Sequence, residues 1–138
     1  MLAGGSQVKV TTDFNRMRLA ELAAISEYAH TLTDEEWNSA SLCGGWRVRD
    51  VIGHMCVGYT TGMPTMLVKI GRRGFNVPNA SLDESIAFAS SRTQDELLAV
   101  LDRIHTQDIR KGIAKVIKPS EGLVDHLIHH QDLSLIHI

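Results

Sequence analysis

The sequence has only two cysteines, no long apolar run and no excess of basic residues. Two cysteines in 138 residues do not form a disulfide framework, so we expect Cys43 and Cys56 to be reduced and Cys56 to be a small buried residue. No apolar run approaches the ~20 residues of a membrane-spanning helix, and the chain does not open with a signal-peptide segment. These observations predict a cytoplasmic protein without a membrane partner.

The charge is almost balanced, because 14 Lys and Arg residues face 16 Asp and Glu residues, for a formal net charge of −2. A nucleic-acid-binding surface needs clustered basic residues to neutralise phosphates, so this composition argues against a DNA or RNA partner. Apolar residues make up 43% of the chain and charged residues 22%, which are ordinary values for a globular protein. We therefore expect one domain with a buried core.

Hydrophobic periodicity predicts a helical fold. Apolar residues recur at three- to four-residue spacing in four places: 14–30, 48–63, a region within 81–104 that is broken near Ser90 and Ser91, and 120–128. No segment alternates with a period of two over a useful length, so we predict an all-α protein, specifically an antiparallel four-helix bundle.

Short local signals mark the ends of these helices. Capping boxes, in which Ser or Thr precedes Glu by three residues, begin at Thr33, Ser81 and Thr93. We expect Asp13 to cap the first helix, Pro64 to kink or end the second, and Ser120 to cap the fourth. Residues 71–78 are expected to form a loop, and residues 114–117 a short extended piece.

The domain boundaries are predicted from where this periodicity begins and ends. The folded domain is expected over residues 13–133. Residues 1–12 contain Gly-Gly-Ser and no periodicity, which favours a leader that is flexible or added by cloning. Residues 134–138 are interpreted as a tail that is non-native or left by truncation.

Histidines provide the strongest chemical signal. Three of the seven lie close together near the end of the chain, flanked by two aspartates: Asp125, His126, His129, His130 and Asp132. Residues four apart on a helix share a face, so either Asp125 with His129 or His126 with His130 could chelate one metal ion. Without a metal, these residues would form a solvated helix face.

A third ligand can come from the second predicted helix, where His54 lies among apolar residues. The alternative for His54 is a hydrogen-bonded core histidine. Three protein ligands with one open position are typical of catalytic divalent-metal sites, and imidazole and carboxylate ligands suit zinc, nickel or iron. Asp50 and Asp132 are placed to accept hydrogen bonds from the ring nitrogens of His54 and His129.

Several segments together resemble a known family: Leu-Thr-Asp-Glu-Glu-Trp at 32–37, Ser-Leu-Cys-Gly-Gly-Trp-Arg-Val-Arg-Asp-Val-Ile-Gly-His at 41–54, Thr-Gln-Asp-Glu-Leu-Leu-Ala-Val-Leu at 93–101, and Leu-Val-Asp-His-Leu-Ile-His-His-Gln-Asp at 123–132. The sequence resembles the N-terminal metal-binding domain of the mycothiol-dependent maleylpyruvate isomerase family, which has a DinB/YfiT-like bundle fold. The resemblance covers roughly residues 14–133.

The resemblance implies that His54 and His129 are metal ligands, with Asp125 at a position where the family usually has glutamate. A helical wheel gives a different weighting, because His129 lies nearly opposite the aliphatic side formed by residues 123, 124, 127 and 128. His126 and His130 lie nearer that side and remain the competing pair. Asp125 and His129 are favoured, because the spacing of His129 and Asp132 fits the resemblance. Zinc is the expected metal, with nickel or iron as alternatives.

The resemblance also implies an enzyme of thiol transferase or isomerase type. A metal-bound mycothiol, or a similar low-molecular-weight thiol, would attack an electrophilic small molecule. No histidine partner is indicated for Cys43 or Cys56, so no catalytic residue is assigned. The alternative function is a non-catalytic DinB-like binding or stress-response module that assembles as a homodimer through exposed helix faces.

Overall fold

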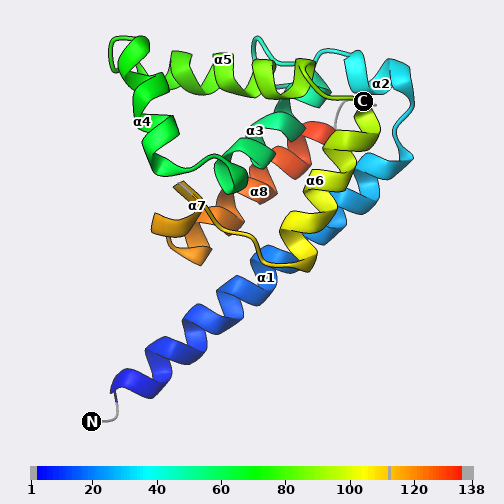
Figure 1. The fold of residues 1–138 in the computed structure, drawn as a ribbon. Helices are drawn as coiled ribbons and strands as arrows, with labels where there is room; N and C mark the ends of the chain where they lie inside the picture. The colour runs from blue at the N-terminus through cyan, green and yellow to red at the C-terminus, as the bar shows by residue number, and fades with distance from the viewer. Residues whose placement is uncertain (1–2, 112, 135–138) are drawn as a thin grey trace.

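A computed structural model describes residues 3–111 and 113–134, and these residues are mostly helical (Figure 1). The helices of this part of the chain are α1 (Ala3–Thr31), α2 (Asp34–Asn38), α3 (Val48–Thr60), α4 (Met63–Arg72), α5 (Val77–Ser90), α6 (Gln94–Thr106), α7 (Ile113–Val116) and α8 (Pro119–Ser134). Within the described ranges there is no strand, only an isolated bridge between Ala40 and Arg47. The prediction of an all-α fold is confirmed.

Helix α3 occupies the centre of the molecule. It packs against α2, α5, α6, α7 and α8, while α1 packs along α6 and α8 (Figure 1). The N-terminal part of α1 extends beyond the other helices (Figure 1). The core side chains that lose all solvent contact come from α1, α3, α6 and α8: Leu22, Ile25, Ala29, Val48, Val51, Ile52, Cys56, Leu97, Leu101 and Leu133, together with Ala89 of α5.

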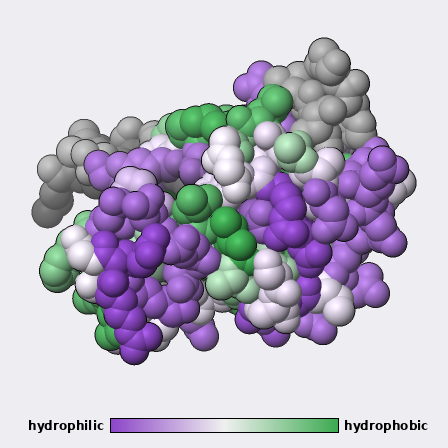
Figure 2. Space-filling model, turned by 90° about the horizontal axis from the view of Figure 1, so that it is seen from above, coloured by the Kyte–Doolittle hydropathy of each residue, from purple (hydrophilic) through white to green (hydrophobic). Residues whose placement is uncertain are grey.

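The face of the molecule drawn in Figure 2 is largely polar. Seen from above, polar side chains cover much of the molecule and are interrupted by smaller apolar patches (Figure 2). None of the helices in the described ranges is both long and apolar enough to cross a membrane.

Two of the predicted capping residues are N-caps of helices in the structure. The Thr33 hydroxyl accepts from the Glu36 amide, and the Thr33 amide donates to the Glu36 carboxylate at 2.7 Å, which closes the capping box of α2. Thr93 caps α6 by accepting from the Glu96 amide at 3.2 Å. The predicted break near Ser90 is confirmed, since α5 ends there.

Other predicted helix ends are wrong. Asp13 does not cap the first helix, because α1 already begins at Ala3. Pro64 neither kinks nor ends α3, which stops at Thr60; it lies in the first turn of α4, where a missing backbone N–H leaves no hydrogen bond unmade. Ser81 lies inside α5, whose first turn is capped by the Asn76 side chain.

The remaining differences concern the segments around these helices. Only the middle of the expected 71–78 loop is non-helical, because α4 runs to Arg72 and α5 begins at Val77. The expected extended piece at 114–117 forms most of the short helix α7 instead. Helix α8 begins before Ser120, where the Lys118 amide donates to the Glu121 carboxylate.

The structure bears on the predicted leader and tail only in part. Backbone of residues 3–12 is helical and continuous with the rest of α1. Residues 1–2 and 135–138 lie outside the described residues. The division into a leader, a domain over 13–133 and a tail therefore stays a prediction.

Candidate metal centre

Three side chains meet where α3 and α8 pack together. His54, Asp125 and His129 each offer one ligand atom, and these three atoms lie within 4.8 Å of one another. Asp125 Oδ1 is 3.3 Å from His129 Nε2, and the His54 and His129 ring centroids are 5.1 Å apart. Ligands that share a tetrahedral zinc ion at ~2.1 Å lie about 3.4 Å from each other, so the Asp125–His129 pair already has this spacing.

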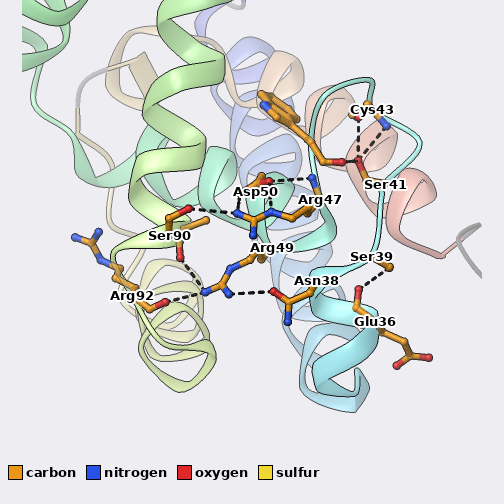
Figure 3. A network of polar contacts seen from close by, with 12 residues as sticks. Glu36, Asn38, Ser39, Ser41, Cys43, Arg47, Arg49, Asp50, Ser90 and Arg92 are labelled. Atoms are coloured by element: carbon orange, nitrogen blue, oxygen red, sulfur yellow. Dashed lines mark hydrogen bonds and ion pairs between the residues drawn. The ribbon is translucent and has the colours of Figure 1, made fainter.

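A tight turn before α3 fixes one wall of this centre. Ser41 hydrogen-bonds the backbone of Cys43 and donates to the Trp46 carbonyl at 2.8 Å (Figure 3). Gly45 has a φ of 84°, in the left-handed region that favours glycine. The turn places the Trp46 ring 4.8 Å from the His54 ring, so an aromatic face covers this histidine.

Asp50 does not orient His54, contrary to the prediction. Its buried carboxylate accepts from the backbone amide and the guanidinium of Arg47, which holds the start of α3 (Figure 3). His54 Nδ1 instead lies 3.4 Å from the hydroxyls of both Ser81 and Ser85 of α5. These contacts leave Nε2 as the candidate ligand atom of His54. No sequence motif pointed to the two serines, because their proximity depends on the packing of α5 on α3.

His129 is held between two carboxylates of its own helix. Its Nε2 faces Asp125, and its Nδ1 lies 3.6 Å from Asp132 Oδ2, so Asp132 is placed beside the ring nitrogen as expected. Burial lowers the pKa of His129, but the hydrogen bond and charge of Asp125, with Asp132, outweigh burial and raise it above its ordinary value. The pocket therefore stabilises positive charge.

The pKa shifts of the other two candidate ligands favour the protonation states in which these groups bind metals. Partial burial raises the pKa of Asp125, but the hydrogen bond and charge of His129 outweigh it, so the pKa lies below its ordinary value. Burial and the charge of His129 lower the pKa of His54, which favours the neutral imidazole that binds metals. An anionic carboxylate and a neutral imidazole are the ligand forms that a divalent ion needs.

The competing histidine pair has other partners. His126 Nε2 is hydrogen-bonded to Tyr59 Oη, and His130 Nδ1 is paired with Glu21 of α1. Among the described residues, the groups close enough to share an ion include neither His126 nor His130.

A second group of potential ligands shares His129. Cys43 Sγ donates to Asp132 Oδ2 at 2.8 Å and lies 4.0 Å from His129 Nδ1, although the sequence indicates no histidine partner for this cysteine. Burial and the Asp132 carboxylate raise the pKa of Cys43 to about 12, so this thiol is protonated at neutral pH. Cys56 is fully buried and unpaired, as expected, and burial raises its pKa to about 12.

Comparison with protein families identifies the chain. Residues 18–110 match the family described as the mycothiol maleylpyruvate isomerase N-terminal domain. The chain belongs to this family. No curated protein and no solved structure matches the chain significantly. The family match includes His54 of α3 and ends before α8, so Asp125 and His129 are assigned from geometry and not from the matched region.

Two small cavities flank His54 in this family member. One, of about 220 Å³, lies between α3, α7 and α8 and is lined by both His54 and Asp125. The other, of about 230 Å³, lies between α3, α4 and α5 and is lined mainly by apolar side chains. Gly58 borders both cavities, one helical turn after His54. A larger cavity of about 570 Å³ lies between α4, α5 and α6, away from the candidate ligands.

Proposed function

We propose that the protein is a divalent-metal-binding, mycothiol-dependent enzyme of thiol transferase or isomerase type that acts on an electrophilic small molecule. The observation that carries this proposal is the meeting of His54, Asp125 and His129 beside a cavity, in a chain of the mycothiol maleylpyruvate isomerase N-terminal domain family. Zinc is the metal we propose, with nickel and iron as alternatives. We further propose a cytoplasmic location and a DinB/YfiT-like four-helix bundle formed by α1, α3, α6 and α8.

Each residue of the centre has a role in this proposal. His54 and His129 supply neutral nitrogen ligands, and Asp125 supplies a charged oxygen ligand. The serine hydroxyls near His54 Nδ1 fix the orientation of its ring, and Asp132 does the same at His129 Nδ1. A divalent ion held by these residues supplies Lewis acidity that lowers the pKa of a bound thiol.

Metal analysis tests the centre directly. Protein purified without added metal is expected to contain about one divalent ion per chain, and His54→Ala is expected to bind zinc at least ~100-fold more weakly, because one of three ligands is lost. His105→Ala is the matched control, since His105 lies on α6 and belongs to neither group of potential ligands among the described residues. Equal metal content in His54→Ala and the unchanged protein contradicts the proposed centre.

Thiol binding tests the enzymatic part of the proposal. We expect mycothiol to bind the zinc-loaded protein in calorimetry, with release of the thiol proton, and to bind the metal-free protein far more weakly. Absence of thiol binding to the zinc-loaded protein contradicts a mycothiol-dependent reaction while leaving the metal centre intact.

A second candidate function is favoured by the outer face of α8. Val124, Leu127 and Ile128 form a row of exposed aliphatic side chains, each about half accessible to solvent. Exposed apolar side chains of this kind are typical of a protein–protein interface, which fits a non-catalytic DinB-like module that acts as a homodimer. Sedimentation of the unchanged protein and of Leu127→Glu distinguishes the candidates. A dimer that dissociates in the variant, together with no thiol binding, favours the second.

A further inference from the structure

A chain of hydrogen bonds between α1, α3 and α8 ends beside the candidate centre. Arg18 is 2% exposed; its Nη2 donates to Asp108 Oδ1 at 2.6 Å and its Nη1 to Tyr59 Oη at 3.0 Å. Tyr59 Oη is in turn hydrogen-bonded to Nε2 of His126, which is 3% exposed. Asp108 balances the buried guanidinium charge, so the chain is held in place at its outer end.

The Arg18 donor favours one direction for the hydrogen bonds of this chain. A guanidinium group can only donate, so the Tyr59 oxygen accepts from Arg18. Among the described residues, His126 Nε2 is the acceptor within reach of the Tyr59 hydroxyl proton. A neutral His126 ring that accepts at Nε2 carries its proton on Nδ1, and a doubly protonated ring carries one there too. In either case, His126 Nδ1–H is a donor.

This donor has no acceptor in the described part of the chain. His126 Nδ1 is buried without a hydrogen-bond partner, and the neighbouring Asp125 carboxylate, at 3.7 Å, is beyond hydrogen-bond range. Buried donors are almost always paired, so an unpaired one needs a specific explanation.

The cavity of about 220 Å³ lies beside this donor. His126 is one of the residues that line it, together with Met55, Ala114 and Ile117. The same cavity is lined by His54 and Asp125, two of the candidate metal ligands. Pockets that bind small molecules combine mostly apolar walls with a few placed polar groups, and this cavity has that composition. Its volume suits a molecule smaller than a typical drug.

We propose that this cavity binds the electrophilic substrate, a small molecule with an apolar body and a carbonyl or carboxylate oxygen, and that His126 Nδ1–H donates a hydrogen bond to that oxygen. The assignment of the ligand as a substrate rests on the proposed function, whereas binding through His126 does not require the metal. A substrate without an acceptor oxygen would leave the donor unpaired, so the same contact would discriminate between ligands.

Nitrogen NMR on ¹⁵N-histidine-labelled, metal-free protein tests the direction of the chain. We expect the His126 ring to show the Nδ1–H tautomer. Cyclohexanone, which carries an acceptor oxygen on an apolar ring, is expected to bind and to shift the Nδ1 resonance, whereas methylcyclohexane is expected to leave it unchanged. An Nε2–H tautomer, or no response of Nδ1 to cyclohexanone, overturns the proposal.

Variants measure the contribution of the contact. His126→Leu replaces the imidazole with an apolar side chain that cannot donate a hydrogen bond, and it is expected to weaken cyclohexanone binding about five- to tenfold. His105→Leu is expected to leave the binding unchanged. Tyr59→Phe keeps the aromatic ring and removes the hydroxyl, so the His126 tautomer is expected to become mixed and binding to weaken. Unchanged affinity in both His126→Leu and Tyr59→Phe overturns the role of this donor.

The outcome is separable from that of the proposed function. Loss of zinc binding in His54→Ala with a silent cyclohexanone experiment supports the metal centre and rejects the substrate cavity. Cyclohexanone binding that depends on His126, together with equal metal content in His54→Ala and the unchanged protein, supports the cavity and rejects the enzyme proposed above.

Discussion

The imidazole rings of His54 and His129 meet edge to face, with centroids 5.1 Å apart and an interplanar angle of 71°. They come from α3 and α8, which are joined by tertiary packing alone. Asp125 joins them because it lies one helical turn before His129 on the same face of α8. The proposed ligand set therefore exists only in the folded chain, and an ion that binds it should stabilise the fold.

Zinc is expected to raise the thermal stability of the protein. An ion that binds only the folded state adds about 2.7 kcal/mol at a free concentration 100 times its Kd. Thermal denaturation with excess zinc and with a chelator measures this difference. Asp125→Asn replaces the charged ligand with a neutral amide and should lose most of the zinc-dependent shift. The same unfolding temperature with zinc and with chelator would contradict the proposed ligand set.

The shared position of His129 allows a test of which ligand group binds the ion. Cys43 and Asp132 lie on the Nδ1 side of the His129 ring. The Cys43 thiol is protonated, however, and donates a hydrogen bond to Asp132. We expect cobalt to bind without a sulfur-to-metal charge-transfer band in its absorption spectrum, and Cys43→Ser to bind cobalt as tightly as the unchanged protein. A sulfur band that disappears in Cys43→Ser would show that the ion binds on the Cys43 side.

The parts of the fold that could be predicted depend on local interactions. The caps at Thr33 and Thr93 are made by residues within one turn, so their spacing in the sequence is sufficient. Pro64 shows the limit of such signals, because proline is tolerated in a first helical turn as readily as it ends a helix. Which of these applies depends on where α3 stops.

The buried face of α8 could not be predicted from the positions of its aliphatic residues. Val124 and Leu127 are exposed, whereas His126 and His129 are buried against the rest of the protein. Hydrophobic periodicity assumes that apolar residues cover the core, and this assumption fails where polar side chains find buried partners such as Tyr59. The prediction from sequence that Asp125 and His129 are the ligands on α8 followed from the resemblance to the family and not from the helical wheel.

Two glycines of α3 should respond oppositely to alanine. A Cβ at Gly53 would lie 2.7 Å from the Ser85 carbonyl oxygen and 3.0 Å from Ala89 Cβ, so Gly53→Ala must push α5 away. A Cβ at Gly58 would meet nothing within 4 Å. We expect Gly53→Ala to lower the free energy of unfolding by about 1–3 kcal/mol and Gly58→Ala to raise it by about 0.5–1 kcal/mol. Urea denaturation measures both, and equal effects would contradict the close approach of α3 and α5.

The inward face of α8 can be checked by truncating side chains on opposite sides of the helix. Leu133 has no solvent contact, whereas Ile128 is more than half exposed. Leu133→Ala is expected to lower the free energy of unfolding by about 2–5 kcal/mol, because it leaves a cavity in the core. Ile128→Ala should change it by less than ~0.5 kcal/mol in the monomer. The reverse order, measured by urea denaturation at low protein concentration, would contradict the orientation of α8.

Asp102 of α6 should make a small contribution to stability that depends on pH. Burial raises the pKa of Asp102, but hydrogen bonds with Ser26 and His30 outweigh burial and lower it below its ordinary value. The folded protein then holds the Asp102 proton less tightly than the unfolded chain does. The contribution to stability is therefore complete above the unfolded pKa of about 3.9 and is lost as pH falls through the folded pKa.

Because Asp102 is partly exposed, Asp102→Asn should cost less than about 1 kcal/mol at pH 7. Urea denaturation of both proteins between pH 7 and pH 3 should show the difference between them shrinking only below about pH 4. A difference that stays constant down to pH 3 would contradict the lowered pKa, and Ser26→Ala, which removes one donor, should raise the Asp102 pKa measured by NMR titration.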